Sequence, residues 1–126
     1  MSALALSLNA PPRTALGRGF VLLAGLAAGA GAVVLLGPWA LALWLLPDLA
    51  MLPGITSGAA RDGRLAPRAV PIYNAVHTYV GPLVLVAAGV LTGPVVLGLG
   101  LIWLSHVSVD RGAGYGLRNA DGSRRG

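Results

Sequence analysis

Each of the chain's two histidines has a nearby residue that could take part in chemistry with it. His106 and Asp110 are four positions apart, a spacing that places two side chains on one face of an α-helix, and Arg111 follows directly. Asn74 and His77 are three positions apart and would share a helix face in the same way. Imidazole and carboxylate groups bind Zn²⁺, Mn²⁺ or Fe²⁺. These pairs therefore indicate a candidate divalent metal site.

The composition around these pairs is that of a membrane protein. The chain of 126 residues is 56% hydrophobic and 10% charged, and it contains no Lys, Glu or Cys. A soluble domain carries about 25% charged residues, so this chain is expected to be solvated by lipid. The absence of Cys excludes disulfides, thiolate ligands and cysteine nucleophiles. All nine basic residues are Arg and flank apolar runs, so the net charge of +5 predicts contact with anionic lipid headgroups rather than nucleic acid.

Two long apolar runs indicate the number of membrane crossings. Residues 19–47 carry no charge, and residues 69–109 contain only the two histidines as groups that titrate near neutral pH. The second run, as one helix, would reach about 60 Å, twice the thickness of the hydrocarbon core, so it must fold back. Gly93-Pro94 and Gly37-Pro38 are the breaker pairs. We predict an all-α polytopic membrane protein with four transmembrane helices as two hairpins, at residues 17–36, 38–53, 70–92 and 94–110.

The arginines distinguish this arrangement from a rival with three crossings, in which residues 17–53 form one tilted helix. Four crossings place all nine arginines on one side of the membrane, whereas three divide them. The positive-inside rule favours four and puts both termini in the cytoplasm of a bacterial inner membrane. We therefore expect three regions: an N-terminal tail at 1–16, a four-helix transmembrane domain at 17–111, and a Gly/Arg-rich cytoplasmic tail at 112–126. The final NADGSRRG is expected to be disordered.

This topology places the polar residues of three spans at one depth, near the cytoplasmic boundary. A central Asp costs about 2.5–3.5 kcal/mol on insertion scales, so these side chains should turn inward and contact one another. We predict a cluster in which Asn74 positions water and four side chains ligate the metal: Asp48, His77, His106 and Asp110. Pro82 lacks an N–H group, so the carbonyl of Thr78 is a further acceptor near the cluster.

The segment that follows the last span contains the spacing GxGxG at residues 112–116. We exclude a dinucleotide fingerprint because no strand precedes it. The glycines are instead expected to end the helix as C-cap residues, and to let Tyr115 cover the cluster. Arg111 is expected to bind an anionic group. Arg111, Tyr115 and Asn74 are therefore the candidate catalytic residues.

Three functions fit this cluster. The first is a metal-dependent hydrolase with Zn, Mn or Fe that acts at anionic lipid or phosphate headgroups. The second is a non-enzymatic membrane assembly or partner-binding protein in which the cluster is a structural hydrogen-bond network. The third is an ion or proton transporter, which would have to be a homo-oligomer because four short helices are too few to enclose a pore. The expected partners are the lipid bilayer and its headgroups, without nucleic acid.

Small and aromatic residues give less specific signals. Gly25 and Gly29 form a small-xxx-small pattern that permits close helix contact, and both packing within the chain and dimerisation fit it. Trp39, Trp44 and Trp103 fit either interfacial or packing positions.

Three segments resemble a family of small bacterial membrane proteins called domain of unknown function 4260. They are LPDLAML at 46–52, YNAVHTYVGP at 73–82 and SHVSVDRGAGYGLR at 105–118. The resemblance covers roughly residues 18–118 and departs from the family in the Gly-, Pro- and Arg-rich loop after Met51. It implies a membrane protein and no particular activity. It carries over seven positions as the family's polar motif: Asp48, Asn74, His77, His106, Asp110, Arg111 and Tyr115.

Overall fold

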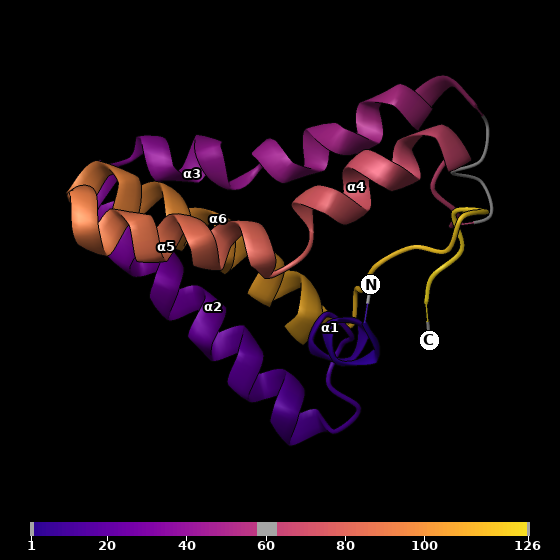
Figure 1. Ribbon diagram of the computed structural model, residues 1–126, viewed down its shortest axis with the longest axis horizontal. Helices are drawn as coiled ribbons and strands as arrows, with labels where there is room; N and C mark the ends of the chain where they lie inside the picture. Colours follow the sequence, from indigo (N-terminus) through magenta and orange to yellow (C-terminus); the bar gives the residue numbers. More distant parts are fainter. Residues whose placement is uncertain (1, 58–62, 126) are drawn as a thin grey trace.

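The computed structural model describes residues 2–57 and 63–125, and their regular secondary structure is helical (Figure 1). The elements are α1 (Ala3–Leu8), α2 (Ala15–Leu36), α3 (Trp39–Trp44), the 3₁₀ helices η1 (Leu46–Ser57) and η3 (Pro67–Ala69), α4 (Val70–Val76), α5 (Val80–Thr92) and α6 (Pro94–Ala113). Within the described ranges the only β-type pairing is an isolated bridge between Arg118 and Arg124. The predicted all-α class is confirmed. Arg61, assigned to the arginine-rich side, lies outside the described residues.

Both Gly-Pro pairs end one helix and begin the next, as predicted. Gly37 has a φ of 71° and Gly93 a φ of 135°, a region of backbone space that favours glycine. Pro38 and Pro94 then start α3 and α6, where a missing N–H group has no helical partner to lose. The two turns lie together at one end of the molecule, and α1 and the C-terminal segment lie toward the other (Figure 1).

Three helical runs are long and apolar enough to cross a membrane: Ala15–Leu36, Pro67–Thr92 and Pro94–Ala113. The predicted second span, 38–53, is not a continuous α-helix. It is divided into the short α3 and the 3₁₀ helix η1, and its apolar part, Trp39–Gly54, is shorter than the other three. Pro47 and Pro53 explain this difference, because each proline removes an amide donor and crowds the carbonyl four residues earlier.

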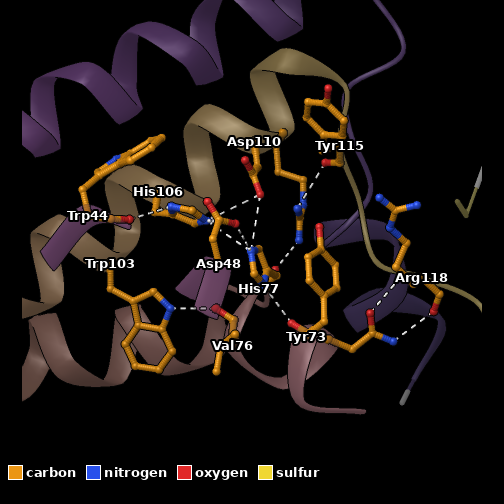
Figure 2. A network of polar contacts seen from close by, with 12 residues as sticks. Trp44, Asp48, Tyr73, Val76, His77, Trp103, His106, Asp110, Tyr115 and Arg118 are labelled. Carbon is orange, nitrogen blue, oxygen red and sulfur yellow. Dashed lines mark hydrogen bonds and ion pairs between the residues drawn. The ribbon is translucent and has the colours of Figure 1, made fainter. Parts of the chain in front are cut away.

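The predicted third span, 70–92, is interrupted in its first half. α4 ends at Val76 and α5 begins at Val80, with His77 as the C-cap of α4. Pro82 accounts for the position of the break, since it offers no N–H to the carbonyl of Thr78. The predicted run is present and long enough to cross a membrane, but it consists of two helical segments rather than one. The break places His77 at the end of α4, where its side chain points toward His106 and Asp110 (Figure 2).

α6 is the central helix of the fold. Buried residues make up 44% of its apolar window, against 11% for α2 and 17% for Pro67–Thr92. Glycines let α2 approach it: a Cβ at Gly25 would lie 2.9 Å from Cβ of Ser108, and one at Gly29 would lie 2.7 Å from Oγ of Ser105. The small-xxx-small pair therefore packs within the chain. In lipid, where apolar burial drives association weakly, such close contacts supply the attraction between helices.

The α5–α6 contact depends on Gly89 in the same way, because a Cβ there would overlap the backbone of Leu97. We expect Gly89→Ala to destabilise the protein by about 1–3 kcal/mol, the usual cost of overpacking. The measurement is thermal unfolding in detergent, followed by circular dichroism. Gly19→Ala in α2 is the matched control, because nothing lies within 4 Å of its added Cβ and alanine favours the helix. Equal unfolding midpoints for the two variants would contradict the close packing of α5 on α6.

Candidate metal centre

Four side chains from three parts of the chain converge beside α6 (Figure 2). Asp48 comes from η1, His77 from the break after α4, and His106 and Asp110 from α6. Asp48, His77 and His106 each offer one ligand atom within 4.8 Å of the others. The two Nε2 atoms are 3.1 Å apart. Oδ1 of Asp48 lies 3.5 Å from each of them, and Oδ2 of Asp110 lies 3.6 and 3.7 Å away.

The outer nitrogen of each imidazole is fixed by a backbone carbonyl. Nδ1 of His77 is 2.8 Å from the carbonyl oxygen of Tyr73, and Nδ1 of His106 is 2.8 Å from that of Trp44. A carbonyl oxygen only accepts hydrogen bonds, so we assign the proton of each neutral ring to Nδ1. Both Nε2 atoms then present bare lone pairs to one another. Two lone pairs flanked by two carboxylates require a positive charge between them, either a proton or a metal ion.

The spacing of the ligand atoms of Asp48, His77 and His106 suits a shared metal ion, and Asp110 lies beside both imidazoles. With metal–ligand bonds of about 2.0–2.2 Å, adjacent ligands of a tetrahedron lie about 3.3–3.6 Å apart. The distances between the imidazole and carboxylate atoms are 3.5, 3.5, 3.6 and 3.7 Å, and the two nitrogens are 3.1 Å apart. A carbonyl on the far nitrogen of a histidine is also the usual support for a metal ligand, because it fixes the tautomer and the ring orientation.

The cluster is closed on the protein side and open at one carboxylate. The imidazoles of His77 and His106 are fully buried, whereas 37% of the Asp48 side chain and 18% of the Asp110 side chain are exposed. A molecule from outside would therefore reach the centre past Asp48.

Aromatic side chains pack around the two imidazoles. The Tyr73 ring stacks on His77 with centroids 3.9 Å apart, and the Trp44 ring lies 4.7 Å from that of His106. The indole of Trp44 donates to Ser105 Oγ, and that of Trp103 donates to the carbonyl of Val76. Trp44 and Trp103 are therefore packing residues.

Arg111 is buried beside the cluster and links the break after α4 to the C-terminal segment. Its Nη2 donates to the carbonyl of His77, and its Nη1 donates to that of Tyr115 at 3.1 Å. The carbonyl that receives this bond lies one residue before the Thr78 carbonyl indicated by the sequence. Nε of Arg111 is buried without a hydrogen-bond partner among the described residues. The guanidinium thus adds a fixed positive charge behind Asp110.

Asn74 lies outside the group of four ligands and binds the C-terminal segment instead. Its Nδ2 donates to the carbonyl of Arg118 at 2.9 Å, and its Oδ1 accepts from the amide of Arg118 at 2.8 Å. This reciprocal pair imitates the pairing of two strands, with a side-chain amide in place of one backbone. The structure therefore gives Asn74 a role in positioning the tail.

Tyr115 lies at the surface, where its ring is 4.9 Å from the guanidinium carbon of Arg124. It follows Gly114, the left-handed C-cap of α6, so the predicted glycine end of this helix is confirmed. The expectation of disorder for the final residues is wrong for those described. Arg125 N–H donates to the carbonyl of Leu117, and Leu65 N–H donates to that of Gly122. These bonds tie the tail to itself and to the segment just before Pro67–Thr92.

The tail contains an exposed turn formed by Asp121 and Ser123. The hydroxyl and the amide of Ser123 both donate to the carboxylate of Asp121, at 2.6 and 3.0 Å. These two donors lower the pKa of Asp121, so the turn carries a charged aspartate at neutral pH.

Sequence reasoning missed Asn9, which joins the N-terminal segment to the helix break. Oδ1 of Asn9 accepts from the amide of Tyr79, the N-cap of α5, at 2.9 Å. Asn9 is buried and also donates to the carbonyl of Ala5. The sequence signal for this role is that Asn9 is a polar residue in a short, mostly apolar segment. Its partner could not be read from the sequence, because the two residues are 70 positions apart.

Loss of the Asn74 amide should release the C-terminal segment. We expect Asn74→Ala to increase the rate of tryptic cleavage after Arg118 and Arg124 several-fold, because the reciprocal bonds to Arg118 are lost. Limited proteolysis followed by mass spectrometry measures this rate. Thr92→Val is the control, since that hydroxyl bonds only within α5 at the other end of the molecule. Equal cleavage of both variants would contradict the positioning role.

No curated protein and no solved structure matches the chain. A family model, described as Domain of unknown function (DUF4260), matches residues 19–125, which include the whole His/Asp cluster and the tail. The chain belongs to this family.

Proposed function

We propose that the protein is a multi-pass metalloprotein of the bacterial inner membrane. It holds one divalent transition-metal ion between Asp48, His77, His106 and Asp110, and hydrolyses an ester in a lipid or phosphate headgroup. The observation that carries the metal site is the pair of bare Nε2 atoms 3.1 Å apart between two carboxylates. Two imidazoles and two carboxylates form a donor set that suits Zn²⁺, Mn²⁺ or Fe²⁺.

The unequal burial of the ligands supports a catalytic site rather than a purely structural one. His77, His106 and Asp110 are mostly or fully enclosed, which gives three stable protein ligands. Asp48 is the most exposed of the four, so it is the ligand that water or substrate can displace. Catalytic zinc sites typically have three protein ligands and one exchangeable position.

The bound ion would lower the pKa of a water molecule and polarise the ester oxygen. Asp48, the most exposed carboxylate, would accept the proton of that water. The water oxygen would form a new bond to phosphorus or carbon as the ester bond breaks, and the leaving oxygen would take the proton from Asp48. Arg111 supplies positive charge from behind Asp110, while the bonds from its Nη atoms to carbonyls fix its position.

We further propose that the membrane domain crosses the bilayer four times, with α3 and η1 together as the second crossing. These two elements run in the same general direction (Figure 1). The 6 residues of α3 and the 12 residues of η1 would reach about 33 Å, because a 3₁₀ helix rises about 2.0 Å per residue. That length matches a hydrocarbon core of about 30 Å. Both Gly-Pro turns then lie on one side and the arginines on the other.

This topology places the cluster inside the bilayer, in its cytoplasmic half. His106 is 12 residues after Pro94, which is about 18 Å along α6 from the far side of a core of about 30 Å. The inner leaflet is therefore the nearer source of substrate for the site.

Elemental analysis tests the metal site. We expect about one ion per chain in protein purified in detergent and supplied with Zn²⁺, Mn²⁺ or Fe²⁺. His106→Gln and Asp110→Asn should each lose most of the metal, because each removes a ligand with little change in volume. Asp121→Asn is the control carboxylate, since Asp121 lies in the exposed tail. The metal should also raise the midpoint of thermal unfolding of the wild type, because it binds only the folded state.

Absence of metal from the wild-type protein, or full metal content in both ligand variants, would contradict this proposal. The same experiment examines a second function, a non-enzymatic assembly protein with a structural network. The observation that favours it is that one proton between the two Nε2 atoms would also satisfy the 3.1 Å contact. In that case His106→Gln lowers the unfolding midpoint, and a chelator leaves the wild type unchanged.

Thiol labelling tests the four-crossing topology, because the chain has no Cys of its own. We expect single cysteines at Ser2 and Arg64 to react from the cytoplasmic side with a membrane-impermeant maleimide. A cysteine at Pro38 should react from the opposite side. These experiments use intact spheroplasts and inverted vesicles. Labelling of Ser2→Cys and Pro38→Cys from the same side would overturn the topology.

A further inference from the structure

An apolar groove of about 310 Å³ is lined in part by residues that are close in sequence to the His/Asp cluster. Three of its lining residues adjoin ligands in the sequence: Pro47 precedes Asp48, Val76 precedes His77, and Trp103 lies one turn before His106. The other walls come from α3, η1, α5 and α6, and they are Leu43, Leu46, Leu85, Leu99 and Ile102. The groove therefore lies between elements that also carry the candidate ligands.

The side chains that line the groove offer a ligand almost only apolar contacts. All its side chains are apolar except the indole of Trp103, whose N–H already donates to the carbonyl of Val76 at 2.7 Å. The volume is at the small end of the range of about 300–1,000 Å³ for small-molecule sites. A single hydrocarbon chain fits this chemistry and size, whereas a polar metabolite would find no hydrogen-bond partner there.

The opposite side of the cluster is polar and cationic. Trp103 and Trp44 lie on one side of the two histidines, and Tyr115 and Arg118 lie on the other (Figure 2). Arg118 is partly exposed and lies beside the partly exposed C-terminal segment with Arg124. The apolar groove, the His/Asp cluster and the arginine-bearing segment thus follow one another in space.

From this order we infer that the ligand is a single-chain anionic lipid. Its hydrocarbon chain lies in the groove past Trp103, its phosphate lies at the His/Asp cluster, and its polar end faces the arginine-bearing tail. This inference rests on the proposed function and names its substrate class. Because the surrounding lipid is as apolar as the groove, the chain alone gains little by entering, so the phosphate must supply most of the affinity.

Quenching of tryptophan fluorescence tests the groove. The probe is dodecyl phosphate that carries bromine near the end of its chain, added to nanodiscs of unbrominated lipid. The host protein is Trp39→Phe, because Trp39 is exposed and would report on bulk lipid. We expect saturable quenching of Trp103, and this quenching should disappear in the additional variant Trp103→Phe. Brominated dodecane without the phosphate should quench without saturation.

Filling the groove should remove the saturable component. We expect the double variant Leu85→Phe and Leu99→Phe to weaken apparent binding at least ten-fold. The control pair, Leu91→Phe and Val95→Phe, adds at least as much volume at exposed positions of the same two helices. Leu46→Phe at the half-exposed edge is a second groove variant in case the double variant fails to fold. Equal binding by groove and control variants, or quenching without saturation in wild type, would overturn the inference.

Metal content, measured on the same samples, separates the two proposals. If the protein binds metal but shows no groove-dependent quenching, the proposed metal site stands and the inferred lipid ligand is overturned. Groove-dependent quenching in a protein without metal retains the lipid site and overturns the proposed function.

Discussion

The contact between the two imidazole nitrogens of His77 and His106 constrains most of the structure. It joins the end of α4 to the middle of α6, and the backbone carbonyls of Tyr73 and Trp44 fix both rings from behind. Three helical segments, α3, α4 and α6, must therefore keep their relative positions for two lone pairs to face one another. Without a cation between them this arrangement would be repulsive in a medium of low dielectric constant. A positive charge at that point, proton or metal, would remove this repulsion.

The broken helix shows how the chain meets that requirement. Irregular backbone at membrane depth is tolerated only where its polar groups find partners inside the protein. The carbonyl of His77 receives a bond from Arg111, and the amide of Tyr79 donates one to Asn9. Both ends of the break are therefore satisfied by residues far away in the sequence. The cost of interrupting the helix is offset, and the freed residue, His77, can leave the helical register and contact α6.

The sequence predicted those parts of the fold that depend on local chemistry. Gly-Pro turns, apolar run lengths and the i, i+4 spacing of His106 and Asp110 act over a few residues, and the structure contains the turns and the cluster. Features that depend on distant partners were missed. The 3₁₀ form of η1, the bond from Asn9 and the ordered tail each need a contact more than 40 positions away or the combined effect of two prolines. Apolar periodicity carries no information on these.

The distribution of ligands over rigid and irregular elements bears on the kind of metal site that results. Two ligands belong to α6, which is the central and most buried of the long helices. His77 is held by hydrogen bonds at its ring and at its carbonyl. Asp48 alone belongs to a 3₁₀ helix, whose hydrogen-bond geometry is poorer than that of an α-helix, and its side chain is the most exposed of the four. A site meant only to hold the fold together would enclose every ligand equally. Here three candidate ligands are mostly enclosed and the fourth is the most exposed, which is the arrangement that the proposed exchange of a bound group requires.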